Sequence, residues 1–191
     1  MTPKLVQESK SRLNREEWLM QALDILAEEH NALLRIDDLV KRMGVTKGSF
    51  YWHFKDRDDF LAQLLEYWVY EFNEKVPEAI NQAVGDQDAR TRLRYMLKYL
   101  VEHDCARYDM VVRSWAAQDP RVGKILKKID KFRLATVHSL FNEMGLSEDD
   151  ARIRARIFVT YISLRAGLFI KRSKREELDA IDAEVEFLTR P

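Results

Sequence analysis

The chain has one cysteine, four prolines and six glycines among its 191 residues. A single cysteine, Cys105, leaves no partner for an internal disulfide, and the sequence has no CxxC or HExxH pattern that would bind zinc. We therefore expect no metal site and a reducing, cytoplasmic compartment. Few glycines and prolines leave little material for long loops or turn-rich sheets, while residues that favour helices are frequent. The composition predicts an all-α fold.

Long apolar runs are also missing. The most apolar stretch, Ile157 to Ile170, is interrupted by Arg165, and Met1 to Ser11 lacks the apolar segment of a signal peptide, so we expect no membrane association. The 32 basic residues equal the 32 acidic residues in number, so attraction to nucleic acid must arise from a local patch. Hydrophobic residues make up 46% of the chain, which is enough to fill a helical core.

Signatures of several large enzyme classes are absent from the sequence, among them the Walker loop, the GxSxG elbow and the GxGxxG fingerprint. The neighbours His103, Asp104 and Cys105 resemble a catalytic or metal-binding cluster only in composition, because adjacent residues on a helix point in different directions. We therefore expect no catalytic residues, no cofactor and no enzymatic activity.

Apolar residues recur at three- and four-residue spacing along most of the chain, which is typical of amphipathic helices. Asn14 with Glu17 indicates the start of the first helix, Pro77 is expected to end the fourth, and Ser147 with Asp150 resembles a capping box. The predicted helices cover residues 14–29, 36–43, 47–53, 57–76, 89–103, 107–117, 120–144, 147–170 and 174–188.

The second and third helices are short and are separated by a three-residue turn. Gly44 suits the left-handed conformation at a helix end, and Thr46 is placed to cap the next helix. In that helix Phe50 and Phe54 lie four residues apart and are expected to face inward. The outer side is then polar and unusually aromatic, with Lys47, Gly48, Tyr51 and Trp52.

The tract from residue 35 to residue 57 reads RIDDLVKRMGVTKGSFYWHFKDR. Its helix, its Gly-Val-Thr turn, its Gly-Ser-Phe-Tyr segment and its His-Phe-Lys exit resemble, in order and spacing, the DNA-binding signature of the tetracycline-repressor (TetR) family. The match continues through Asp59, Phe60 and Leu61, and covers about a quarter of the chain. The resemblance implies an N-terminal helix-turn-helix domain, here residues 1–57, and a helical regulatory and dimerisation domain, here residues 58–191.

The residue types of the short third helix suit contact with duplex DNA. Gly48 permits close approach, Lys47 can donate to guanine, and Trp52 offers an apolar face to a thymine methyl group. Tyr51 and His53 can donate to phosphate oxygens, while the remaining candidates supply hydroxyl or basic groups. The predicted DNA contacts are Arg35, Thr46, Lys47, Gly48, Ser49, Tyr51, Trp52, His53, Lys55 and Arg57.

One of the predicted DNA contacts departs from the family pattern, and three of them have an alternative role. Arg35 stands where the family usually has threonine or serine, so a helix cap and a hydroxyl contact are replaced by a charged contact. The alternative is that Tyr51, Trp52 and His53 are core aromatics, but Phe50 and Phe54 already occupy the inner face. Residues 35–57 contain six basic and three acidic side chains, and the N-terminal tail adds further basic residues at Lys4, Lys10, Arg12 and Arg15.

Aromatic side chains are plentiful after residue 57 and could line a pocket for a largely apolar small-molecule effector. Each of them alone is also an ordinary core residue. The candidates are Trp68, Phe72, Tyr95, Tyr99, Trp115, Phe132 and His138.

The last two predicted helices carry apolar stripes that are expected to form a homodimer through a four-helix bundle. Residues 151–175 hold eight basic and no acidic side chains, and 176–186 hold six acidic ones, which suits an antiparallel pair or two solvated faces. The predicted interface comprises Ile153, Ile157, Tyr161, Leu164, Leu168, Leu178, Ile181, Val185 and Leu188.

Together these patterns predict a ligand-responsive repressor that binds a palindromic double-stranded DNA operator as a homodimer. A helical adaptor that acts mainly through protein partners is the first alternative, and footprinting on promoter DNA separates the two. A small-molecule-binding or enzymatic helical scaffold is the second, and it predicts turnover that survives loss of the first 57 residues.

Overall fold

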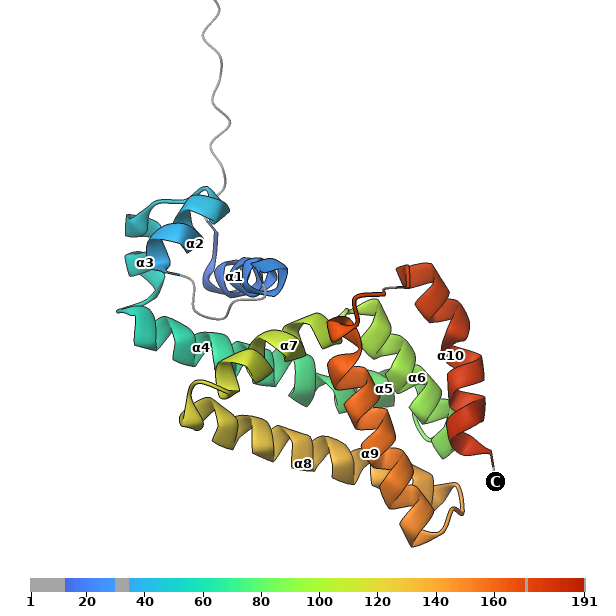
Figure 1. Ribbon diagram of the computed structural model, residues 1–191. Coiled ribbons are helices and arrows are strands. Elements are labelled where there is room, and N and C mark those ends of the chain that lie inside the picture. Colours follow the sequence, from blue (N-terminus) through green and yellow to red (C-terminus); the bar gives the residue numbers. More distant parts are fainter. Residues whose placement is uncertain (1–12, 30–34, 171, 191) are drawn as a thin grey trace, which may run out of the picture.

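The computed structural model describes residues 13–29, 35–170 and 172–190, and all regular structure in these ranges is helical. Lys4, Lys10 and Arg12 of the predicted basic tail lie outside the described residues. The elements are α1 (Arg15–Glu29), α2 (Ile36–Met43), α3 (Lys47–His53), α4 (Arg57–Val69), the π-helical turn η1 (Tyr70–Glu74), α5 (Lys75–Val84), α6 (Ala89–Glu102), α7 (Cys105–Ala116), α8 (Pro120–Glu143), α9 (Glu148–Leu164), the 3-10 turn η2 (Arg165–Gly167) and α10 (Lys174–Thr189). The all-α prediction is confirmed (Figure 1).

Side-chain caps begin several of these helices. Asn14 and Glu17 exchange hydrogen bonds at the start of α1, with each side chain accepting from the other residue's backbone N–H at 2.9 and 2.7 Å. Ser147 accepts from the N–H of Asp150 at 3.2 Å, but its hydroxyl donates to the Asp150 carboxylate at 2.6 Å. Ser147 is therefore a cap without the reciprocal half of the predicted capping box.

The helix that begins at Arg57 does not end at Pro77. α4 continues through η1 into α5, and Pro77 lies in the first turn of α5. A π-helical turn shifts the hydrogen-bond register, so the proline follows a place where the regular ladder is already interrupted. The predicted helix end at Pro77 is therefore wrong, and α5 is a helix that the sequence patterns did not predict.

Two clusters of buried side chains form the interior. The first joins α1 to α4 with η1, α7 and the first half of α8, and includes Trp18 and Trp68. The second joins α5, α6, the second half of α8, α9 and α10, and includes Phe141 and Phe158. The first cluster crosses residue 57, and α1 packs directly on α7. The division of the chain at residue 57 into a DNA-binding domain and a regulatory domain therefore stays a prediction.

α9 is shorter than predicted. It ends at Leu164 and is followed by η2, so Leu168 lies beyond the helix that was expected to reach Ile170. The predicted apolar stripe is therefore helical only as far as Leu164, because Leu168 has an extended backbone.

α10 packs chiefly along α6 and not along α9 (Figure 1). The ion pairs Arg90–Glu186 and Arg94–Asp182 connect the two helices. The predicted pairing of the basic segment 151–175 with the acidic segment 176–186 is present only in part. Ion pairs of 3.3 Å join Arg165 to Glu177 and Arg172 to Glu184, and Tyr161 of α9 donates to Glu184 at 2.8 Å.

This packing buries the apolar side of α10. Three of its side chains expose 8% or less of their surface within the second core cluster, and the fourth packs against the same cluster. Since they already face α6, they do not form the predicted partner stripe for a second subunit. These residues are Leu178, Ile181, Val185 and Leu188.

Candidate nucleic-acid interface

A compact group of aromatic rings fixes α3 against α1 and α4. Trp18, Phe50, Phe54 and Phe60 are buried, and the centroid distances between their rings run from 5.0 to 6.2 Å. Most of these pairs meet edge to face, the arrangement that ring quadrupoles favour. The predicted inward positions of Phe50 and Phe54 are confirmed. α3 is therefore held on a rigid base.

The turn between α2 and α3 adopts the predicted conformation. Gly44 has φ 65° and ψ 31°, the left-handed region, and closes α2. The Thr46 hydroxyl oxygen accepts from the backbone N–H of Ser49 at 3.1 Å and so caps α3. Together these two residues set the angle at which α3 leaves α2.

The outer side of α3 exposes large and charged side chains. Tyr51 exposes 58% and Trp52 66% of its surface. Lys47 is also exposed and forms an ion pair of 2.7 Å with Asp37 of α2. The hydrogen bond to Asp37, together with its charge, raises the pKa of Lys47 above its usual value. Lys47 is therefore a cation on an exposed aromatic surface.

Two predicted contact residues already have partners inside the chain. The Trp18 indole N–H donates to the Ser49 hydroxyl oxygen at 3.2 Å, which joins α3 to α1. The Nε2 atom of His53 lies 3.0 Å from the carbonyl oxygen of Leu13. Ser49 and His53 are both half-buried, and these contacts help to position α3.

The remaining candidates flank α3. Arg35 is exposed at the N-cap position of α2, and its side chain makes no capping hydrogen bond, as expected for arginine in place of threonine or serine. Lys55 is exposed in the segment that leaves α3, and Arg57 is half-buried in the first turn of α4. The structure thus gathers the predicted residues on and beside α3.

Gly48 has no internal reason to be glycine. Its φ angle is not positive, and a Cβ atom there would meet only the Thr46 hydroxyl oxygen at 3.5 Å, an ordinary contact. Glycine weakens a helix by about 1 kcal/mol relative to alanine. Close approach of the α3 backbone to another molecule would explain a glycine at position 48, because glycine has no side chain.

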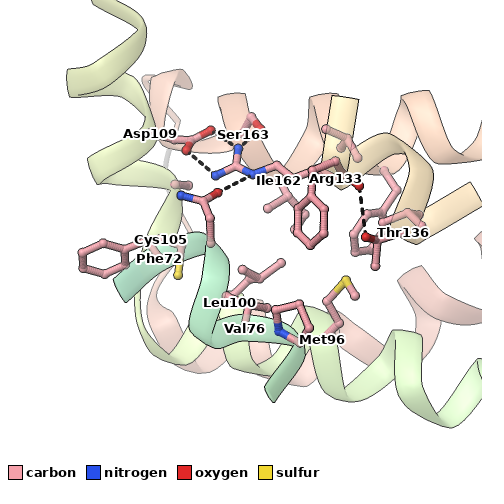
Figure 2. Close-up of a pocket in the computed structure, with 17 residues that line it drawn as sticks. Phe72, Val76, Met96, Leu100, Cys105, Asp109, Arg133, Thr136, Ile162 and Ser163 are labelled. Carbon is pink, nitrogen blue, oxygen red and sulfur yellow. Dashed lines mark hydrogen bonds and ion pairs between the residues drawn. The ribbon is translucent and has the colours of Figure 1, made fainter. Parts of the chain in front are cut away.

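A cavity lies among η1 and α5 to α9 in the second half of the molecule (Figure 2). Its free volume is about 60 Å³. Phe72, Val76, Met96 and Leu100 form part of an apolar wall, and a cluster of polar side chains occupies one end (Figure 2). The cavity is thus mostly apolar with one polar end.

The polar end is centred on Arg133 of α8. Its guanidinium donates to both carboxylate oxygens of Asp109 at 2.7 Å, to the side-chain amide oxygen of Asn73 at 2.9 Å and to the Ser163 hydroxyl oxygen at 3.3 Å (Figure 2). Asn73, Asp109 and Ser163 each expose 4% or less of their surface. This network was not predicted. Arg133 on the apolar side of α8, four residues from Ile129, was the signal in the sequence that could have indicated it.

The predicted aromatic pocket is only partly present. Phe72 and Phe132 line the cavity. Trp68 is fully buried in the first core cluster, and Trp115 lines a different groove beside α4. Trp68 is therefore a core residue, as the alternative interpretation of these aromatics had it.

Three further candidates lie away from the cavity wall. Tyr95 and Tyr99 pack against the second core cluster, and the Nε2 atom of His138 lies 3.2 Å from a carboxylate oxygen of Glu148. Tyr99 also stacks on His103, with centroids 4.0 Å apart. Of the seven predicted side chains, Phe72 and Phe132 line this cavity and the other five do not, while effector binding by any of them stays a prediction.

Cys105 lines the cavity and is buried, and this burial raises the pKa of its thiol to about 12. Among the described residues no group of three or more histidine, cysteine, aspartate or glutamate side chains is arranged to hold a metal ion. Within the same ranges no helix combines the length and the apolar character needed to cross a membrane.

Residues 20–64 match the family described as bacterial regulatory proteins, tetR family. The chain is 30% identical to the HTH-type transcriptional regulator AcrR of Shigella flexneri over 102 residues, and these residues are 53% of this chain. The chain spans about half the length of this curated relative, 46%.

Two solved structures from Rhodococcus sp. RHA1 share the fold over nearly the whole chain. A transcriptional regulator superposes with a TM-score of 0.67 at 18% identity, over 92% of this chain and 96% of that one. A TetR-like transcriptional regulator superposes with a TM-score of 0.64 at 20% identity, over 93% of this chain and 96% of that one. The matched residues 20–64 contain α2, its turn, α3 and the start of α4, whose geometry is described above. Residues 20–64 therefore carry the helix-turn-helix segment of the tetR family, and the resemblance found in the sequence is confirmed over this part of the chain.

Proposed function

We propose that this protein is a transcriptional repressor that binds a palindromic DNA operator as a homodimer and releases it when a small molecule binds. The observation that carries the proposal is the outer side of α3. Lys47, Tyr51 and Trp52 are exposed there on a rigid aromatic base, beside a glycine that the fold itself does not require. A short helix of this kind fits the major groove.

The side chains on this surface divide into two kinds of contact. Lys47 and Trp52 reach base edges, since an ammonium group pairs with guanine acceptors and an indole face contacts a thymine methyl group. Tyr51, Lys55 and Arg57 contact phosphates, and Arg57 does so at the start of α4 where free backbone N–H groups add attraction. Asp37 holds Lys47 in the free protein and releases it to the DNA.

The homodimer forms through the outer side of α9. Ile153, Ile157 and Leu164 lie on one side of this helix and expose 45 to 58% of their surface. Burial of such a stripe against a second copy is favourable because it removes apolar area from water. Tyr161 lies among them with its hydroxyl donating to Glu184 at 2.8 Å, so it orders the surface more than it adds apolar area.

The ligand acts through the continuous helix from α4 to α5. The first turn of α4 carries Arg57, and its extension η1 forms part of the cavity wall. Within η1, Asn73 donates to the carbonyl oxygen of Trp68 at 3.2 Å and accepts from Arg133 at 2.9 Å. Since π-helical turns often mark functional positions, a ligand that moves this turn changes the placement of α3 on DNA.

A cytoplasmic regulator without enzymatic activity follows from this role. A helical adaptor that binds only proteins is the second candidate, since the exposed aromatics of α3 would also suit a protein partner. The two candidates differ in what they bind. Only the repressor protects a defined DNA segment.

The test is capture of genomic DNA fragments by the purified protein, followed by footprinting and titration of the recovered sequence at several salt concentrations. The repressor predicts a roughly symmetric protected site and a log affinity that falls by about 0.9 per phosphate contact for each unit of log salt. Recovery of random fragments with no protected site contradicts the proposal and favours the adaptor.

A further inference from the structure

The charges at the polar end of the cavity cancel one another. Arg133 pairs with Asp109, and Arg113 pairs with Asp130 through two hydrogen bonds of 2.7 and 3.1 Å. Arg113 also lies 3.4 Å from Asp109, so the four groups form one network of two cations and two anions. A charged ligand would lose its hydration on entry and find no unbalanced opposite charge.

The rest of the wall adds no charge. It is lined by aliphatic and aromatic side chains together with Thr136 and Cys105. The Thr136 hydroxyl donates to the Phe132 carbonyl oxygen at 3.0 Å. Burial keeps Cys105 as the neutral thiol, because it raises the pKa to about 12. The cavity therefore favours an uncharged molecule with a largely apolar body.

One hydroxyl group on the cavity wall can donate a hydrogen bond to a ligand. Ser163 exposes 2% of its surface and lines the cavity. In the hydrogen bonds among the described residues its oxygen accepts from Arg133 and its own proton has no acceptor. Placing a hydrogen-bond acceptor of a ligand beside this hydroxyl supplies the missing partner.

We infer that this cavity binds an uncharged, largely apolar ligand that places one hydrogen-bond acceptor, such as a carbonyl or ether oxygen, against Ser163. The inference rests on the proposed ligand-responsive function and names the chemical class of that ligand. It also assigns Ser163 as a residue that determines specificity.

The cavity must widen to admit such a molecule. Its free volume of about 60 Å³ is smaller than the space that drug-sized ligands fill, about 300 Å³ or more. Met96 on the wall is unbranched and adapts easily to a new shape. Phe132 exposes 46% of its surface and so has room to turn outward. Entry of a ligand therefore moves the wall, which includes η1.

The test uses four naphthalenes that share one ring system and differ in one substituent. They are 2-acetylnaphthalene, 2-ethylnaphthalene, 2-naphthoate and 2-naphthylmethylammonium, and their binding to the full-length protein is measured by calorimetry without DNA. We expect 2-acetylnaphthalene to bind at least about tenfold more tightly than either ion, because ions lose more hydration on burial. We expect it to exceed 2-ethylnaphthalene by about 2- to 10-fold, the value of one hydrogen bond.

Ser163→Ala should remove the preference for the acetyl compound over the ethyl compound and leave binding of the ethyl compound unchanged. Ala106→Leu, which fills the cavity from α7, should abolish binding of both. Thermal unfolding of each variant shows that it is folded. A Ser163→Ala protein that keeps the full acetyl preference would overturn the role of Ser163.

Tighter binding of 2-naphthoate or 2-naphthylmethylammonium than of the acetyl compound would overturn the ligand class. Binding that persists in Ala106→Leu would overturn the location. If none of the four compounds binds a parent protein that still binds its operator, the cavity is no ligand site, and the DNA-binding function stands without it.

Discussion

The N-terminal helices and the cavity region hold their functional side chains in opposite ways. In α3 the apolar rings face inward and the polar and aromatic groups face solvent on a packed base. Around the cavity the polar groups face inward and are held by one another, and the free space lies beside them. The first arrangement presents a fixed surface. The second can be rearranged by a molecule that enters the cavity, which suits the detection of a ligand better than the recognition of a fixed DNA surface.

Removal of Asp109 is expected to have the largest effect on stability. Asp109→Ala leaves the guanidinium of Arg133 buried without its carboxylate and should lower the free energy of unfolding by about 3–5 kcal/mol. Chemical denaturation measures this. The double variant Asp109→Leu with Arg133→Met removes both charges and should recover most of the loss. A single variant as stable as the parent would mean that the network does not hold the cavity region together.

Cys105 should be nearly unreactive in the folded protein. Its pKa of about 12 leaves little thiolate at pH 8, so we expect a rate with Ellman's reagent on the order of 100-fold or more below that of an exposed thiol. Because the folded pKa is raised, this thiol contributes stability that is full below its ordinary value of 9 and is lost toward pH 12. Lys127→Cys supplies the exposed control. Equal rates at the two positions would show that the cavity opens freely.

The outer side of α9 should control assembly without affecting the fold. Ile157 exposes 50% of its surface, so Ile157→Asp costs the monomer little while placing a charge in the proposed interface. Sedimentation at micromolar protein should give a monomer, and Lys131→Asp on α8 should stay dimeric. An Ile157→Asp protein that remains dimeric moves the interface elsewhere.

Gly48→Ala should separate stability from DNA binding in α3. We expect the free energy of unfolding to rise by up to about 1 kcal/mol, because alanine favours the helix and no close contact opposes it. Operator affinity should fall, since the new methyl group stands between α3 and the DNA. Unchanged affinity would mean that the backbone of α3 does not approach the duplex closely at this point.

The N-terminal part was predictable because its signals are local. The caps of Asn14 and Thr46, the glycine at position 44 and the four-residue spacing of Phe50 and Phe54 each act over a few residues. The same positions carry the motif that resembles the TetR family. What the sequence did not indicate there is that Ser49 has a second role, because its contact with Trp18 spans 31 residues.

The cavity region was less predictable because its arrangement depends on contacts between distant helices. Arg133 meets Asp109 and Asn73 from separations of 24 and 60 residues. The apolar spacing on α10 predicts a buried side but does not say whether α6, α9 or a second subunit covers it. Pro77 was misinterpreted because a π-helical turn, which has no simple sequence signal, precedes it.

Operator affinity of the Lys47→Ala, Tyr51→Ala double variant is the most direct test of the central claim that α3 reads DNA. Both side chains are exposed, so the variant should unfold at nearly the parent temperature. Each substitution is expected to cost about 1–3 kcal/mol of binding free energy. Titration of the footprinted site, with Lys127→Ala as a matched control, should show a large loss for the double variant and none for the control. A folded double variant that binds this site as tightly as the parent would contradict the account.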